Sequence, residues 1–383
     1  MLVDSLKTAL AKAPTIKEKA TLLDNLSRTL MNINPQEADI FGKQLINIAE
    51  ESRDRKIMID AYKSNGLRYS YFAGQKDYIN KSVESYNKAL NIARQNKLEA
   101  EIGGIQLKLA SVHLAIPDKD KALTYVNEAF SLISTLADDS LKTEAHVTYG
   151  MVYLAKNEKT LALRNYLNAL RIAEGIKEND KEGRSRKVDL VRNCYHYLAD
   201  FYRTIEDYDR AIDYATMAYK KLDESKKRSV AYQRVVDINY IGNLFAGKKS
   251  YDIAIGYFER SIAMADSLKF ATLKMPGYVS LLNQYLRIKQ PQKALAYMNS
   301  EAGQNLQKFL NGFGFSGVTD QAFAVIYTET GQYDSARVYF DRATPYFEKG
   351  ASEANKLSFY RQLATFYKRT ANNTTAIEYF LKV

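Results

Sequence analysis

The stretch Ala322–Ala343, AFAVIYTETGQYDSARVYFDRA, contains the pattern that decides the fold. Two small residues, Ala324 and Ala336, lie on either side of Gly331, and the aromatic Phe340 follows at helical spacing. Helices that pack closely need small residues where their axes approach and aromatic side chains to fill the space beside them. A glycine can also adopt the left-handed conformation that ends a helix. The stretch therefore predicts two helices that form a hairpin with a turn at Gly331.

This pattern returns along the whole sequence. The second small residue of each copy recurs at intervals of 40 to 49 residues, most often 40. These residues are Ala38, Ser82, Ala122, Ala162, Ala211, Ala254, Ala294, Ala336 and Ala376. Self-similarity at a fixed period is typical of stacked arrays, in which each repeat packs on its neighbours. The sequence therefore predicts an all-α solenoid of about nine hairpins. We expect a single array over residues 1–383, with a capping helix in 1–20 and repeats in 21–383, the last of them truncated.

Two segments depart from the regular spacing. Residues 174–189 are strongly charged and carry two glycines, which indicates either an extended helix end or a protruding loop. Residues 311–320, NGFGFSGVTD, contain three glycines, and these should interrupt a helix. Within that segment, Phe313 and Phe315 could either dock onto the array or contact a partner. The roles of both segments stay open.

Composition narrows the class of protein. Fifty-five Lys and Arg against 44 Asp and Glu give a net charge of +11, but the charges are spread in mixed groups along the sequence. We interpret them as solvated helix ends and faces, so nucleic acid is not an expected partner. No apolar run approaches the roughly 18–20 residues of a spanning helix, and the first residues lack the pattern of a secretory signal. The single cysteine, Cys194, excludes intrachain disulfides and is expected to be a small buried residue.

The sequence contains no convergent set of catalytic groups. His113, His146 and His196 lie in three different repeats without metal-ligand spacing. No glycine-rich phosphate loop follows a strand pattern, and no local motif selects a nucleophile. We therefore predict a protein without enzymatic activity, cofactor or metal.

These repeats resemble the tetratricopeptide repeat, whose signature is a small residue, an aromatic three residues later, a turn, and then alanine, an aromatic and alanine on the second helix. The resemblance covers residues 22–383. The family usually has a 34-residue period and a tryptophan in the first helix. This protein has no tryptophan and a period nearer 40, so it is similar to a branch with longer helices. The resemblance implies a right-handed superhelix whose first helices line a concave groove that binds a peptide or protein segment.

Residues of the first helices that do not belong to the packing signature are the candidate groove residues. In the first half they are mostly apolar: Leu23, Leu67, Leu107, Val147 and Met151. From the fifth repeat they become polar: Asn193, His196, Asp200, Arg203, Asn239, Asn243, Asn283, Gln321, Arg361 and Lys368. Amide groups can both donate to and accept from an extended peptide backbone. Arg203, Arg361 and Lys368 could bind carboxylates or the free C-terminus of a ligand. The alternative is that these are ordinary exposed helix residues.

Two functions are compatible with this pattern. The first is a non-catalytic binding scaffold, similar to the repeat regions that precede the membrane segment and output domain of some bacterial sensor kinases and regulators. It would be extracytoplasmic and would meet the membrane only through a segment outside this sequence. The truncated last repeat, with apolar Ile377, Tyr379 and Phe380 uncovered, favours a longer natural protein.

The second is a cytoplasmic peptide-responsive regulator, in some relatives phosphatase-like, that acts on a response regulator or a DNA-binding partner. It would require an N-terminal helical bundle, for which only residues 1–19 are available. The ligand, the compartment and the oligomeric state stay open.

Overall fold

The computed structural model describes residues 2–31, 34–70, 76–116, 118–177, 181–225, 230–268, 271–312, 316–350 and 353–383. These residues form twenty α-helices, a short 3-10 helix and connecting turns, and no strand occurs among them. The predicted all-α class is confirmed.

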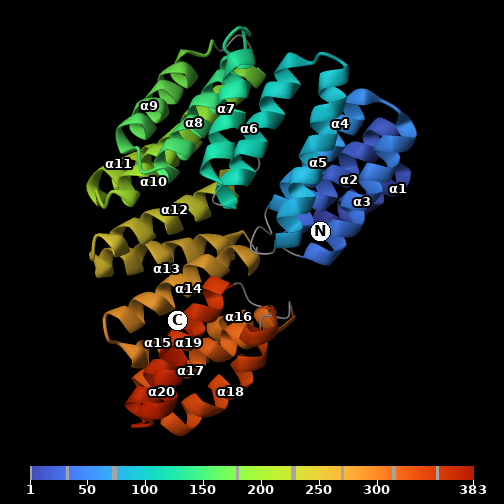
Figure 1. The fold of residues 1–383 in the computed structure, drawn as a ribbon. Coiled ribbons are helices and arrows are strands. Elements are labelled where there is room, and N and C mark those ends of the chain that lie inside the picture. Colours follow the sequence, from blue (N-terminus) through green and yellow to red (C-terminus); the bar gives the residue numbers. More distant parts are fainter. Residues whose placement is uncertain are drawn as a thin grey trace. The chain divides into compact units, whose positions relative to one another are not determined.

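The protein forms two compact units, Met1–Lys226 and Lys227–Val383. In the first unit, helix α1 (Leu2–Lys12) packs on α2, and five helical hairpins follow (Figure 1). The hairpins are α2 (Ile16–Leu30) with α3 (Pro35–Ser52), α4 (Arg55–Ser70) with α5 (Lys76–Gln95), α6 (Glu99–Ala115) with α7 (Lys119–Ile133), α8 (Asp139–Ala155) with α9 (Lys159–Gly175), and α10 (Lys181–Thr204) with α11 (Tyr208–Lys221). The short helix η1 (Leu222–Glu224) follows α11.

The second unit contains four hairpins and one additional helix. The hairpins are α12 (Val230–Gly247) with α13 (Tyr251–Ser267), α14 (Ala271–Arg287) with α15 (Pro291–Asn299), α17 (Ser316–Glu329) with α18 (Tyr333–Gly350), and α19 (Glu353–Arg369) with α20 (Asn373–Phe380). Helix α16 (Glu301–Gly312) lies between the second and third of them in sequence. The described residues thus contain nine hairpins, as the repeats predicted. The single array over 1–383 stays a prediction, because the structure defines the hairpins within each unit.

The structure describes parts of the two segments that depart from the regular repeat spacing. Helix α10 is 24 residues long and already begins at Lys181, so an extended helix takes up much of the widest repeat interval. The predicted interruption near residue 312 is confirmed, since α16 ends at Gly312 and α17 begins at Ser316. Phe313 and Phe315 lie outside the described residues, so their role stays open.

The nine small residues that repeat at about 40-residue intervals are all buried, with exposed fractions between 0% and 3%. Eight are alanines, and the ninth, Ser82, carries a hydroxyl that must find a partner inside the protein. It donates a hydrogen bond of 2.7 Å to the carbonyl oxygen of Gly66 on the facing helix. The position therefore requires a small side chain. The polar hydroxyl of Ser82 is tolerated there because it has a hydrogen-bond partner.

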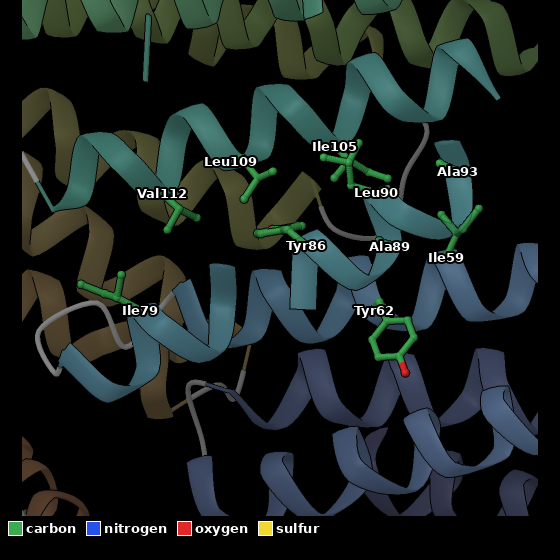
Figure 2. Packing of buried hydrophobic residues seen from close by; sticks show 10 residues of the cluster. All are labelled: Ile59, Tyr62, Ile79, Tyr86, Ala89, Leu90, Ala93, Ile105, Leu109 and Val112. Atoms are coloured by element: carbon green, nitrogen blue, oxygen red, sulfur yellow. The ribbon is translucent and has the colours of Figure 1, made fainter. Parts of the chain in front are cut away.

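Glycines of the first helices meet aromatic side chains of the second helices in four hairpins. A Cβ atom added at Gly150 would lie 2.4 Å from the Tyr166 ring, and one at Gly66 would lie 2.9 Å from the Tyr86 ring. These distances are too short for a real Cβ contact, so only glycine allows the helices to approach this closely. Tyr86 belongs to a buried cluster that joins α4, α5 and α6 (Figure 2). One ring therefore holds a hairpin together and also contacts the next repeat.

Six hairpin turns share one backbone geometry. Each contains a residue with φ between 57° and 76°: Asn157, Glu206, Lys249, Lys289, Gly331 and Ala371. The next backbone N–H donates to a carbonyl five residues earlier, as Gln332 does to Tyr327 at 2.9 Å. This arrangement satisfies carbonyl groups at the helix end. The predicted left-handed turn at Gly331 is confirmed, but the other five residues carry a side chain in a conformation that costs each roughly 1–2 kcal/mol.

Replacement of Gly150 by alanine should destabilise the protein. The added methyl group would overlap the Tyr166 ring, and overpacking of this kind costs about 1–3 kcal/mol. Urea unfolding followed by circular dichroism measures the change. The matched control is Gly256→Ala in α13, where no atom lies within 4 Å of the added Cβ, and this variant should be neutral or slightly stabilised. Equal effects of the two substitutions would show that the ring contact does not require glycine.

The left-handed turns predict opposite effects for two exchanges. Gly331→Ala should destabilise the second unit by about 1 kcal/mol, because no atom lies near the new Cβ and only backbone strain acts. Lys249→Gly should stabilise the same unit by up to about 1 kcal/mol, because the exposed lysine there has φ 66°. Urea unfolding midpoints measure both. A loss of stability in Lys249→Gly would contradict this explanation.

Candidate functional site: the first-helix face

The first helices of consecutive hairpins contact one another within each unit. The pairs are α2 with α4, α6 with α8, and α8 with α10 in the first unit, and α12 with α14 and α17 with α19 in the second. We call the polar and exposed residues of these helices the first-helix face. All ten candidate groove residues lie on first helices, four of them on α10 and six on α12, α14, α17 and α19.

In the first unit, charged and polar pairs join neighbouring first helices. The Lys63 ammonium on α4 lies 2.8 Å from the Glu101 carboxylate on α6. Lys108 on α6 pairs in the same way with Glu144 on α8. The partners are 38 and 36 residues apart, close to one repeat, so equivalent positions of consecutive repeats meet. The face of this unit is therefore largely ionic.

In the second unit, amide and hydroxyl groups take these positions. The Ser280 hydroxyl on α14 donates to Oδ1 of Asn243 on α12 at 3.4 Å. The Gln321 amide on α17 donates to Oε1 of Gln362 on α19 at 2.8 Å. An ion pair of 2.8 Å between Arg369 and Glu329 also joins α19 to α17. The face of this unit thus combines neutral hydrogen-bonding groups with charges near the helix ends.

The structure places the six candidates of the second unit differently. Exposed side chains are found at Asn243, Asn283, Arg361 and Lys368. Gln321 is half-buried and already bonded to Gln362. Oδ1 of Asn239 is inaccessible and has no hydrogen-bond partner among the described residues. Asn239 therefore does not offer its carbonyl oxygen to a ligand, whereas Asn243 and Asn283 can do so.

The four candidates of the first unit lie along one side of α10. Asn193 and Arg203 are exposed, while His196 and Asp200 are half-buried. The Arg203 guanidinium lies 3.1 Å from the Asp200 carboxylate. An exposed pair of this kind contributes little to stability, but it occupies the cation that was expected to bind a ligand carboxylate.

The predicted apolar groove in the first half of the protein is wrong for three of its five residues. Leu23 and Leu107 are 1% exposed, and Val147 is 7% exposed, so these side chains belong to the core. Leu67 and Met151 are half-buried. Adjacent helix residues are rotated by about 100° from one another, so an error of one position exchanges the core for the surface. The accessible residues of the first helices in this part of the protein include charged pairs such as Lys63 with Glu101.

Three exposed apolar residues of the second unit were missed. Tyr232 and Val236 on α12 are 49% and 43% exposed, and Val279 on α14 is 44% exposed. Tyr232 and Val236 lie eleven and seven residues before Asn243, and Val279 lies four residues before Asn283. This spacing places each set along one side of its helix. Counting back from the two asparagines in helical steps would have found them.

The cysteine and histidine side chains, which could act in catalysis or metal binding, are mostly buried or lie apart from one another. Cys194 is buried, and burial raises the pKa of its thiol to about 12, so the predicted small buried cysteine is confirmed. His113 is 3% exposed in α6, and His146 on α8 contacts the Asn165 amide oxygen at 3.0 Å. Within the described ranges, no group of three or more His, Cys, Asp or Glu side chains could hold a metal ion. No helix in the described part is long and apolar enough to span a membrane.

Comparisons with known proteins support the fold. No family model matches the sequence. Lipopolysaccharide assembly protein B of Escherichia coli is 24% identical over 150 residues, which are 38% of this protein and 35% of that one. The match thus spans about a third of the curated relative.

Solved structures share the fold over most of the sequence. One is aspartyl phosphate phosphatase F from Bacillus subtilis, with a TM-score of 0.55, 15% identity, and coverage of 94% of this protein and 91% of that structure. Another is a Rap protein complexed with Competence and Sporulation Factor, with a TM-score of 0.51, 14% identity, and coverage of 95% and 96%. A third is a STAND signal-transduction ATPase with a tetratricopeptide repeat sensor from Pyrococcus horikoshii, with a TM-score of 0.57, 15% identity, and coverage of 92% and 52%.

These likenesses, together with the nine hairpins, confirm the tetratricopeptide-like fold that the repeats predicted.

Buried His113 should make the stability of the first unit depend on pH. Burial, with a smaller effect of Lys121, lowers the pKa of its imidazole below the ordinary value of 6.5, although the Asp118 carboxylate opposes this. The unfolded state then binds a proton that the folded state does not, so stability is complete above pH 6.5 and falls as the pH falls below it. His113→Phe should keep the stacking on Tyr125 and lose this dependence. Urea unfolding from about pH 7.5 to about pH 5.5 tests this, and equal slopes for both proteins would contradict it.

Proposed function

We propose that the protein is a non-catalytic scaffold that binds a peptide or an extended protein segment on its first-helix face. The observation that carries this proposal is the surface of α12 and α14. Exposed Tyr232 and Val236 lie on the same side of α12 as exposed Asn243, and exposed Val279 lies on the same side of α14 as exposed Asn283. Apolar side chains beside amide groups provide both contact area and backbone hydrogen bonds to a peptide.

The amide groups are suited to a backbone ligand for a physical reason. An asparagine or glutamine side chain both donates and accepts, as a peptide unit does. Asn243 is held by Ser280, so its side chain loses less freedom when a ligand binds. Arg361 and Lys368 on α19 add exposed cations that fit a carboxylate of the ligand. Among the ten candidate residues, Asn243 and Asn283 are therefore the strongest candidates for binding a peptide backbone.

The comparisons support a role in signalling. One structure with this fold is a Rap protein complexed with Competence and Sporulation Factor, and another contains a tetratricopeptide repeat sensor. On this basis we propose that the protein is the sensory or interaction region of a larger signalling protein. We also propose an extracytoplasmic position, with a cytoplasmic position as the alternative.

The second candidate function is a peptide-responsive regulator with phosphatase-like action on a response regulator. It is favoured by the likeness in fold to aspartyl phosphate phosphatase F. Incubation with a phosphorylated response regulator separates the two functions, because a scaffold without activity leaves the rate of phosphate loss unchanged.

The double variant Asn243→Ala, Asn283→Ala should bind peptide less well. Peptides selected on the wild-type protein from a phage-displayed random library provide the ligand, and fluorescence anisotropy gives the Kd. We expect a loss of about tenfold or more, because each substitution removes hydrogen bonds to the peptide backbone. Both side chains are exposed, so thermal unfolding should be nearly unchanged.

The matched control is Gln292→Ala, Asn305→Ala, which removes two exposed amides from α15 and α16, outside the first helices. It should bind the selected peptides as the wild type does. Equal Kd values for both double variants would show that the peptide binds elsewhere.

A further inference from the structure

A cavity of about 370 Å³ lies between α2, α3 and α4 of the first unit. This volume falls in the range of small-molecule sites. Its lining combines an apolar part, formed by Ala20, Leu45, Ile57 and Ala61, with charged residues. The cations are Lys17, Arg28, Lys56 and Lys63, and the carboxylates are Asp24, Asp54 and Asp60. The site is separate from the face of the second unit described above.

Part of this charge is used inside the protein. The Arg28 guanidinium lies 2.8 Å from Oδ1 of Asp24, and the Ser64 hydroxyl donates to the same oxygen. Oδ1 of Asp54 accepts from the backbone N–H groups of Lys56 and Ile57 and so caps α4. Asp54 and Arg28 therefore have structural roles at the edge of the cavity.

Asp60 has an incomplete counter-charge. The Lys63 ammonium is 3.8 Å from its carboxylate but only 2.8 Å from that of Glu101, so the lysine is shared and closer to the glutamate. Partial burial, with smaller effects of Glu101 and Asp24, raises the pKa of Asp60, against the opposing effects of Lys63 and Lys56. The side chain is 55% exposed, so a ligand can reach it. This region of the cavity favours a cation.

The part of the cavity where α2 and α4 begin carries positive charge. Lys17 and Lys56 are the second residues of α2 and α4, and both are exposed. Among the described residues, no carboxylate lies within 4 Å of either ammonium group. The positive end of the α2 dipole adds to this charge, whereas the start of α4 is already capped by the Asp54 carboxylate. This region of the cavity favours an anion.

We propose that the cavity binds a short peptide with both termini free, with its ammonium group near Asp60 and its carboxylate near Lys17 and Lys56. Lys56 precedes Asp60 by one helical turn, which corresponds to about 6 Å along the axis of α4. A dipeptide or tripeptide carries its charges at such a separation, whereas those of a free amino acid are closer together. The apolar lining accepts small side chains.

Calorimetric titration of the full-length protein with the dipeptide Ala-Ala tests the site. Ala-Ala should bind at least tenfold more tightly than N-acetyl-Ala-Ala, Ala-Ala-amide or free alanine, because each of these lacks one charge or the separation. Asp60→Asn and Lys56→Gln should each weaken Ala-Ala binding at least tenfold. Thr21→Phe, which fills the cavity from α2, should abolish it.

The matched control is Asp139→Asn on α8. Asp139 also lies 3.8 Å from a lysine three residues later and is also 55% exposed, but it does not line the cavity. This variant should bind Ala-Ala as the wild type does, with all variants checked by circular dichroism. No heat of binding with the wild type, or equal binding by Asp60→Asn and Asp139→Asn, would overturn the proposal. Selected library peptides report separately on the second unit, so either result can fail alone.

Discussion

The close approach of a small residue to an aromatic ring, as between Gly150 and Tyr166, is the constraint on which the fold depends. It allows the two helices of a hairpin to pack with almost no space between them. The ring fixes which side of the first helix faces its partner, so the remaining sides are fixed as well. In α4 and α5 the ring of Tyr86 also joins the cluster that contacts α6. One contact thus sets both the hairpin and its stacking, and leaves one side of each first helix free to vary.

The free side has different chemistry in the two units, although in both it carries polar pairs between neighbouring first helices. Lys63 pairs with Glu101 in the first unit, and Ser280 pairs with Asn243 in the second, in each case about one repeat apart. Partly exposed pairs of either kind contribute at most about 1 kcal/mol each. The burial of small and aromatic residues therefore holds the hairpins of each unit together, while the first-helix face can change its polarity without loss of fold.

The difference between the buried packing positions and the variable first-helix face explains what the sequence could predict. The nine small residues are recognisable because a size limit at a buried position leaves few alternatives, and their regular spacing repeats the signal. The face carries no such limit. Leu107 was assigned to the surface and lies in the core, because neighbouring helix positions differ by about 100° and both can be apolar. Asn239 was assigned to the surface for the same reason, although its Oδ1 atom is inaccessible. Polar pairs such as Lys108 with Glu144 were detectable in principle as opposite charges one repeat apart.

The cavity of the first unit could not be predicted from the sequence, because three helices build it. Whether one of its charged side chains is available to a ligand depends on the partner of that side chain. Asp60 is distinctive because Lys63 turns toward Glu101, which belongs to the next repeat. The next first helix, α6, has the opposite charge at its start. That helix begins with acidic Glu99 and Glu101, whereas α2 and α4 carry Lys17 and Lys56 in their first turns. Cations at the start of two adjacent first helices, followed within one or two turns by carboxylates, occur together at this end of the first unit. A repeated backbone can therefore carry different charges at equivalent positions, so a ligand site need not recur in every repeat.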